Sequence, residues 1–443
     1  MKPNDTHRRR SCSAALASLV IALAACSGGS DSPTGGEADA KAGNEAPVPI
    51  RTPLQAPTDA KSYELMGNSV ALHGDVAVVG VWDGEARKLR AFVFRHVGRD
   101  WKFEQRLQME EQSLSPFVPG RDRIRTDGKQ IAVSEHSALF VHRYDGRAWV
   151  QDFVLKREQL GPGQFEAMVV QGDRLAFMYT AGADPEEWVQ TVHTYRRVAG
   201  EWKKEAELVP ADGTNRGLEI FGSTLAIDGD LLVAASGSHT AGGLARGAAY
   251  VFRHGPGGWK QEARLTAADT GADPEANDRL GTSAAVSSTR ILLGAPEYRD
   301  PSGNHGAIFE FLYRNGRWEP GARIVYAGAG ENRFGEVLAM AGDTFVAGSP
   351  FALADWHGAA YVFRLRNAAW VSTDLAEEVP GPKQSFGFDV ATDGRQAIVS
   401  SWGMAVIPIG ELVPGLFPKA AEPEPKPVIR RGAAIYDLER GWQ

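Results

Sequence analysis

Large ring-bearing side chains follow successive segments of small and branched apolar residues along the chain. They are Trp82, His136, Trp188, His239, Tyr298, Trp356 and Trp402. Carboxylates lie beside several of these rings, as Asp83 and Glu297 do. Because rings stack on sugars and peptides while carboxylates direct hydrogen bonds, we predict that the seven residues bind a ligand. The alternative is that the rings pack against neighbouring loops and only close the surface there.

Residues suited to catalysis are few. Acid and imidazole side chains lie close in sequence at Glu135 and His136 and at Asp355 and His357, but a chain with 10 histidines contains such pairs by chance. The sequence has no metal-ligand spacing, nucleophile elbow or phosphate-binding loop. We therefore predict no catalytic residue, no cofactor and no metal, and an enzyme is the less favoured interpretation.

The charge and the cysteines exclude two further classes of function. The chain has 48 basic and 55 acidic residues and a net charge of -7. Residues 1–25 hold four basic residues and one acidic residue, so the remainder carries -10. This excess of negative charge argues against a nucleic-acid partner. The two cysteines are Cys12 and Cys26, both near the N-terminus, so no disulfide is expected in the fold.

The N-terminus has the pattern of a secreted, lipid-anchored protein. Arg8–Arg10 precede an apolar run over Ala14–Ala25, which indicates a signal peptide over residues 1–25. Leu23–Cys26 resembles the lipobox of bacterial lipoproteins, in which the cysteine receives the lipid. We predict lipidation at Cys26; an ordinary cleaved signal peptide is the alternative.

Residues 26–49 contain no aromatic residue and are rich in Gly, Ser, Asp, Ala and Pro, which predicts a flexible tether after the lipidated cysteine. Residue 27, which follows the cysteine, is Ser, whereas Asp at this position would resemble the inner-membrane retention signal of Gram-negative lipoproteins. The sequence thus favours the outer membrane, on either its periplasmic or its surface side, with the membrane contacted only through the lipid anchor.

One pattern recurs from about residue 62 onward: two strands joined by a tight turn, a variable loop, an aromatic strand, a second tight turn and a tryptophan. The first turns fall at Gly74, Gly128, Gly172, Gly229, Ser288, Gly342 and Gly394. Pairs such as Asp228-Gly229 favour two-residue hairpins. A four-stranded sheet that is apolar on both faces must stack on others, so seven copies predict an all-β, seven-bladed β-propeller over residues 50–418.

Ring closure is predicted to use the N-terminal strand of the domain. The last repeat supplies Phe386–Val390, Gln396–Ser400 and Ala405–Ile409 but has no evident fourth strand. Pro49–Leu54 resembles the fourth strand of another repeat and is expected to complete the sheet. Residues 419–443, which begin with Pro- and Glu-rich sequence, are expected to form a tail. The alternative is that Gly432–Trp442, which weakly resembles a third strand and its tryptophan, closes the ring instead.

Phe221-Gly222, Phe334-Gly335 and Phe386-Gly387, followed after a second strand by Gly294-Ala295-Pro296 or Gly348-Ser349-Pro350, resemble the FG-GAP repeats of integrin alpha-subunit propellers and bacterial surface proteins. The resemblance covers residues 50–413 and implies a propeller that binds partners. It would also imply calcium loops of the Asp-x-Asp-x-Asp-Gly kind, which this sequence lacks. An acidic segment with Asp269, Asp273 and Asp278 is expected to be solvated rather than to bind a cation.

These observations favour an outer-membrane-tethered lipoprotein whose propeller is a non-catalytic, monomeric binding or adhesion module for a protein or glycan. The two other hypotheses are an extracytoplasmic glycan hydrolase or lyase and a scaffold for envelope assembly. The ligand is expected on the face that carries the long loops, because the other face has only short turns.

Overall fold

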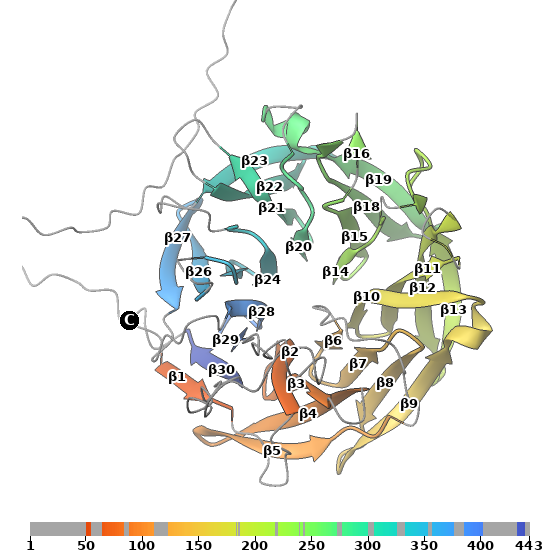
Figure 1. Ribbon diagram of the computed structural model, residues 1–443, viewed down its shortest axis with the longest axis vertical. Helices are drawn as coiled ribbons and strands as arrows, with labels where there is room; N and C mark the ends of the chain where they lie inside the picture. Colours follow the sequence, from red (N-terminus) through yellow and green to blue (C-terminus); the bar gives the residue numbers. More distant parts are fainter. Residues whose placement is uncertain are drawn as a thin grey trace, which may run out of the picture.

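Each copy of the repeat folds into a four-stranded antiparallel sheet, and in the computed structural model seven such sheets surround a central axis as the blades of a propeller (Figure 1). The predicted all-β, seven-bladed architecture is therefore confirmed. The structure describes residues 50–54, 64–83, 88–109, 123–182, 184, 187–217, 220–238, 240–241, 244–272, 277–299, 305–325, 333–352, 357–375, 385–401 and 432–438.

The strands of each blade are numbered outward from the axis in chain order, except in blade seven. Blades one to three are β2 (Glu64–His73), β3 (Val76–Asp83), β4 (Lys88–Val97) and β5 (Asp100–Arg106); β6 (Ile124–Thr126), β7 (Gln130–Ser134), β8 (Ala138–Tyr144) and β9 (Trp149–Lys156); and β10 (Gly163–Gln171), β11 (Arg174–Ala181), β12 (Val189–Val198) and β13 (Glu201–Leu208). A short 3-10 helix, η1 (Arg157–Gln159), leads from β9 toward β10.

Blades four to seven follow the same plan. They are β14 (Thr224–Asp228), β15 (Leu231–Ser236), β18 (Ala248–Gly255) and β19 (Gly258–Leu265); β20 (Ser283–Ser287), β21 (Arg290–Arg299), β22 (His305–Arg314) and β23 (Arg317–Val325); β24 (Val337–Ala341), β25 (Thr344–Ser349), β26 (Ala359–Arg366) and β27 (Ala369–Leu375); and β28 (Phe386–Thr392), β29 (Gln396–Ser401), β30 (Gly432–Asp437) and β1 (Ile50–Pro53). A two-stranded ribbon of β16 (Thr240–Ala241) and β17 (Leu244–Ala245) and the 3-10 helix η4 (Ala267–Thr270) lie outside the blades.

Near the axis, glycines let the backbones of neighbouring blades meet. Gly294 of β21 lies against Gly335, which precedes β24, and a Cβ added to Gly294 would collide with the Gly335 carbonyl oxygen. Gly348 and Gly387 meet in the same way between blades six and seven. The glycine of each Gly-Ala-Pro or Gly-Ser-Pro motif thus faces the glycine of the next Phe-Gly motif. Any side chain there would push the blades apart.

The phenylalanine of the Phe-Gly motif fills the wider space farther from the axis. Phe221 packs edge-on against Tyr250 of β18, with ring centroids 5.4 Å apart, and Phe334 packs in the same way on Tyr361 of β26 at 5.6 Å. Both phenylalanines are fully buried. Small residues near the axis and rings farther out therefore match the wedge-shaped space between the blades.

At the outer edge, a tryptophan of one blade donates its indole N–H to a carboxylate of the preceding blade. In the described part of the chain the bonds join Trp149 to Glu104 (2.9 Å), Trp202 to Asp152 (3.2 Å), Trp259 to Glu205 (2.8 Å), Trp318 to Glu262 (3.0 Å) and Trp370 to Glu310 (3.1 Å). An arginine also contacts each carboxylate, namely Arg95, Arg197, Arg174, Arg253 and Arg290 respectively. We call each tryptophan, carboxylate and arginine set a blade latch.

We expect Trp259→Phe to lower the free energy of unfolding by about 1–2 kcal/mol, because the ring is kept while the half-buried Glu205 loses a donor. Urea denaturation would measure the loss. Trp101→Phe is the matched control, since Trp101 holds the same position in blade one and its indole has no carboxylate partner among the described residues. Equal losses in the two variants would contradict the latch.

Blade seven is completed by both ends of the domain. β1 pairs with β30, Thr52 lying opposite Ile435, and β30 pairs with β29, Ile435 lying opposite Ile398. The prediction that the N-terminal strand is the outer strand of the last blade is confirmed. Blade seven also bonds to blade one near the axis, where Val70 N–H donates to Asp389 Oδ2 at 2.8 Å.

The expected tail over residues 419–443 is wrong for residues 432–437, because these form β30, the third strand of blade seven. The predicted third strand, Ala405–Ile409, lies outside the described residues. Burial explains the placement of β30: Ile435 and Tyr436 are buried, and Tyr436 packs on Phe386 as Tyr250 does on Phe221. The resemblance of Gly432–Trp442 to a third strand, stated as the alternative, is thus confirmed for residues 432–437, while β1 remains the outer strand.

We expect removal of residues 432–443 to lower the melting temperature steeply or to cause aggregation, because β29 and β1 would both lose their partner and expose strand edges. Removal of residues 439–443 alone keeps β30 and is the control. Thermal unfolding followed by circular dichroism would compare the two. If both truncations melted like the full chain, β30 would not be needed for closure.

Candidate binding site on the long-loop face

The antiparallel order of the strands gives the propeller two unlike faces. The turns between first and second strands and between third and fourth strands lie on one, the hairpin face; the remaining connections lie on the other, the long-loop face. Turns on the hairpin face are short, and Gly229 and Asp230 alone join β14 to β15. Their aspartates form ion pairs, as Asp230 does with Arg174 at 2.6 Å and Asp343 with Arg290 at 3.4 Å. The hairpin face therefore offers little variety for recognition.

A groove of about 640 Å³ lies on the long-loop face, where blade two connects to blade three. Its lining residues are Arg157, Glu158, Gly161, Pro162, Gly163, Gln164, Thr180, Gly182 and Trp188. They come from η1, from the entry into β10 and from the two ends of the β11–β12 connection. The groove joins a half-buried indole to charged, amide and hydroxyl groups.

Hydrogen bonds hold the floor of this groove in place. The Tyr179 hydroxyl donates to the Gly161 carbonyl oxygen at 2.5 Å, and Gly217 N–H donates to the Trp188 carbonyl oxygen at 2.9 Å. Burial raises the pKa of Tyr179 to about 12, so the phenol stays protonated and keeps donating. The groove thus has a rigid floor beside the more exposed η1.

A cluster of polar side chains continues from the groove between the inner strands of blades two and three. Arg123 donates to the Phe165 carbonyl oxygen (2.7 Å) and contacts His136 Nε2 (3.1 Å) and Glu166 Oε2 (3.3 Å). The other oxygen of Glu166 accepts from Gln164, which lines the groove, at 2.5 Å. Arg123 is buried, so it serves as the centre of this cluster.

The titration of the cluster follows from burial. Burial, and then the positive charge of Arg123, lowers the pKa of His136 to about 4. At neutral pH the imidazole is therefore uncharged, and its Nε2 accepts from Arg123. Burial also raises the pKa of Glu166, although Arg123 and Gln164 oppose this shift. A neutral imidazole and a carboxyl group with a raised pKa thus flank one guanidinium.

Two of the seven predicted ligand residues, Trp188 and His136, belong to this site: Trp188 lines the groove, and His136 joins the adjoining cluster. Tyr298 is elsewhere, only 6% exposed, with its ring 5.4 Å from Phe309 and Arg323 stacked over it. The ring of Tyr298 is thus part of a buried apolar cluster. Trp82 lies in β3 opposite Leu65 and Leu89. His239, Trp356 and Trp402 fall outside the described residues, so their role stays a prediction.

Sequence reasoning missed Arg123, Gln164 and Glu166, which link His136 to the groove. They lie on the inner strands or at their entry, whereas the search for ligand residues considered only the loops after second strands. The available signal was the sequence of these two blades, in which Phe117-Val118 and Gln164-Phe165 stand where Phe-Gly would be expected.

Cation binding is not supported by the described part of the acidic segment before blade five. Asp269 accepts from Thr266 N–H and from its hydroxyl, at 2.7 and 2.9 Å, and so caps η4. Asp278 is buried and Asp273 is outside the described residues. Across the described ranges, no group of three His, Cys, Asp or Glu side chains could hold a metal ion.

Comparison with known proteins identifies the repeat. A model of the FG-GAP repeat family matches residues 202–252 and 259–311. A search of curated proteins found no match. Among solved structures, a Lactobacillus plantarum protein is similar with a TM-score of 0.45 and 13% identity over 71% of this chain and 85% of that one. Each matched segment begins at an outer-strand tryptophan and ends on the third strand of the next blade, so one sequence repeat spans a blade interface.

Proposed function

We propose that this β-propeller with FG-GAP repeats is a non-catalytic binding module, tethered to the outer membrane by lipid, that holds its ligand on the long-loop face. One observation carries the proposal: Trp188 and His136, which the sequence nominated independently, lie in or beside one groove with a rigid floor. His136 is connected to the groove through Arg123, Glu166 and the lining residue Gln164, so two residues about 50 positions apart belong to one connected site around a concavity, as is expected of a binding site.

The groove suits a glycan better than a peptide. The Trp188 indole can stack on the apolar face of a sugar ring, while Arg157, Glu158 and Gln164 supply donors and acceptors around it. Arg157 and Glu158 form an exposed ion pair at 3.9 Å. Breaking this pair to bind ligand hydroxyls costs little free energy, because exposed ion pairs are weak. A peptide that bound by adding a strand would need a free strand edge. In blades two and three only the innermost and outermost strands have one, because the other strands pair on both sides.

Catalysis is not favoured by the geometry of the cluster. Both oxygens of Glu166 and Nε2 of His136 are already bound to Arg123 or Gln164, so these groups stabilise one another. The raised pKa of Glu166 is nevertheless the property of a general acid and supports glycan hydrolysis as the second candidate.

We expect Trp188→Ala to abolish binding of a glycan identified on an array, because loss of a central aromatic contact costs about 2 kcal/mol or more. Trp101→Ala, which removes an indole from an outer strand, is the control for folding and should bind normally. Equal binding by Trp188→Ala and the wild type would place the site elsewhere. Release of a shorter glycan by the wild type but not by Glu166→Gln would favour the hydrolase.

The anchor is the second part of the proposal, and its support is the Leu23–Cys26 motif followed by the polar segment to residue 49. Among the described residues, no helix is long and apolar enough to cross a bilayer. We expect Cys26→Ala to abolish incorporation of a fatty-acid analogue in metabolic labelling. A Cys12→Ala variant, which alters the other cysteine, should still be labelled. Equal labelling of Cys26→Ala and the wild type would rule out this anchor.

A further inference from the structure

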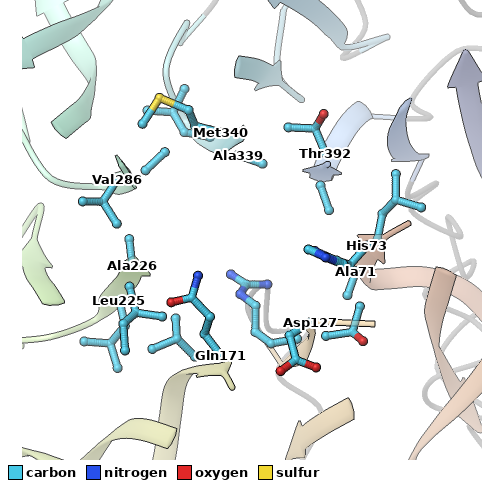
Figure 2. A pocket seen from close by; sticks show the side chains of 18 of the residues that line it. Ala71, His73, Asp127, Gln171, Leu225, Ala226, Val286, Ala339, Met340 and Thr392 are labelled. Atoms are coloured by element: carbon cyan, nitrogen blue, oxygen red, sulfur yellow. The ribbon is translucent and has the colours of Figure 1, made fainter. Parts of the chain in front are cut away.

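The outer strand of each blade has one edge to which no further strand pairs in the described part of the chain. Such an edge can bind the backbone of another chain, and proteins usually protect it with bulges, lysines, prolines or short strands. The other open edges, those of the innermost strands, face the channel. Figure 2 shows Ala71, Ala226 and Ala339 of three inner strands around a cavity of about 210 Å³ there, too small for an additional strand. Another chain can therefore reach only the outer edges.

Five outer strands are interrupted by a register shift in their pairing with the third strand, as at a β-bulge. These strands are β5, β9, β13, β19 and β23. In the first four, the unpaired residue is the carboxylate of the blade latch, namely Glu104, Asp152, Glu205 and Glu262. The irregularity that protects the edge therefore also supplies the latch.

Sequence adds further protection to most outer edges. A lysine is present in β5, β9, β13 and β19, and β23 contains Pro320. The outer strand of blade seven, β1, pairs regularly with β30 but has only four residues, the last of which is Pro53. Each of these six outer edges thus carries at least one of the known protective features.

The outer strand of blade six, β27, is the exception. Its seven residues pair with β26 without a register shift, from Ala369 opposite Arg366 to Leu375 opposite Ala360. It contains no lysine, arginine or proline. Figure 1 shows β27 on the outer rim of the ring. A straight, unprotected edge of this length is what a partner strand needs in order to add to a sheet.

The hydrogen bonds of blade six determine which backbone groups of β27 point to the open edge. Leu365, which lies opposite Trp370, donates its N–H to the Asp343 carbonyl oxygen, on the side away from β27. Leu365 and Trp370 are therefore a pair without mutual hydrogen bonds, and such pairs alternate along an antiparallel ladder. Trp370, Ser372 and Asp374 thus turn their N–H and C=O groups outward, where a partner strand can bind them.

The residues of the edge favour a basic partner segment that contains β-branched residues. Val371 is 40% exposed, and Asp374 is the one charged residue of β27. Pairs of β-branched residues and pairs of opposite charge on neighbouring strands stabilise a sheet. The chain has a net charge of -7, so a second copy would bring charge of the same sign, whereas a basic segment would be attracted.

We propose that the open edge of β27 binds an extended, basic segment of a protein partner by strand addition. The partner strand would form backbone hydrogen bonds with Trp370, Ser372 and Asp374, and its β-branched side chains would contact Val371. This edge is in blade six, whereas the groove at Trp188 is lined by residues of blades two and three and the connection between them. The two sites are therefore independent.

A fluorescein-labelled peptide of alternating valine and lysine is the probe, and fluorescence anisotropy measures its binding to the full chain. The control peptide has the same sequence but a methyl group on every second backbone nitrogen, which removes the donors of one strand edge. We expect the unmethylated peptide to bind about tenfold or more tightly. Equal binding of the two peptides would overturn the proposal.

The variant Ser372→Pro should weaken binding of the unmethylated peptide about tenfold or more, because it removes an N–H that points outward. Its melting temperature should stay close to that of the wild type, since proline is tolerated where an edge N–H is unpaired. Ser372→Thr keeps the N–H and should bind normally. Trp188→Ala should also bind normally, which separates this site from the groove. Undiminished binding by Ser372→Pro would contradict the assignment.

Hydrogen exchange of the wild-type chain provides a test that needs no variant. We expect the amides of Trp370, Ser372 and Asp374 to exchange rapidly without peptide and to become protected with it, while that of Val371, which faces β26, is protected throughout. Protection of the three amides in the dilute chain alone would show that the edge is already covered and would refute the proposal. Protection that appeared only on concentrating the chain, together with a doubled mass, would assign the edge to a second copy instead.

Discussion

Contact between neighbouring blades is the constraint on which this molecule depends. A four-stranded sheet with two apolar faces cannot remain in water alone, so every face needs a neighbour and the ring must close. Near the axis the contact is made by backbone, where Gly294 meets Gly335. At the rim it is made by the blade latches, which place a carboxylate between an arginine and an indole. Spacing and angle between blades are therefore set at both ends of the interface.

The same constraint explains why the family pattern crosses blade boundaries. The matched segments run from the tryptophan of one blade to the third strand of the next. The first of them contains aromatic residues that pack together at one interface, as Phe221 and Tyr250 do between blades three and four. What the sequence repeats is an interface rather than a sheet, because the interface is where side chains must fit one another.

The two faces acquire different capacities from this arrangement. On the hairpin face, two-residue turns and ion pairs such as Asp230 with Arg174 leave little freedom to vary. On the long-loop face the connections are longer, as between β13 and β14, and they can differ from blade to blade. Blades two and three depart most from the Phe-Gly pattern, and there Arg123, His136 and Glu166 form a polar cluster at the interface.

The fold could be predicted from the sequence because it rests on local signals that repeat. Pairs such as Asp228-Gly229 specify hairpins. A strand of small residues followed by a strand with aromatic residues indicates which of the two lies nearer the axis. Pro49–Leu54 was recognisable as an outer strand for the same reason. Trp188 and His136 could be nominated because they follow second strands.

Tertiary structure alone decided what depends on contacts distant in sequence. β30 joins the last blade by pairing with β1 and β29 and by burying Ile435 and Tyr436. The proline-rich sequence before it gives no sign of this pairing. Tyr298 became a core residue because Phe309 and Arg323 cover its ring. Arg125 reads as one more charged residue in sequence, and only closure of the ring surrounds it with alanines from the other inner strands. Local patterns determine each blade, whereas the environment of a side chain is determined by the neighbours that the closed ring brings to it.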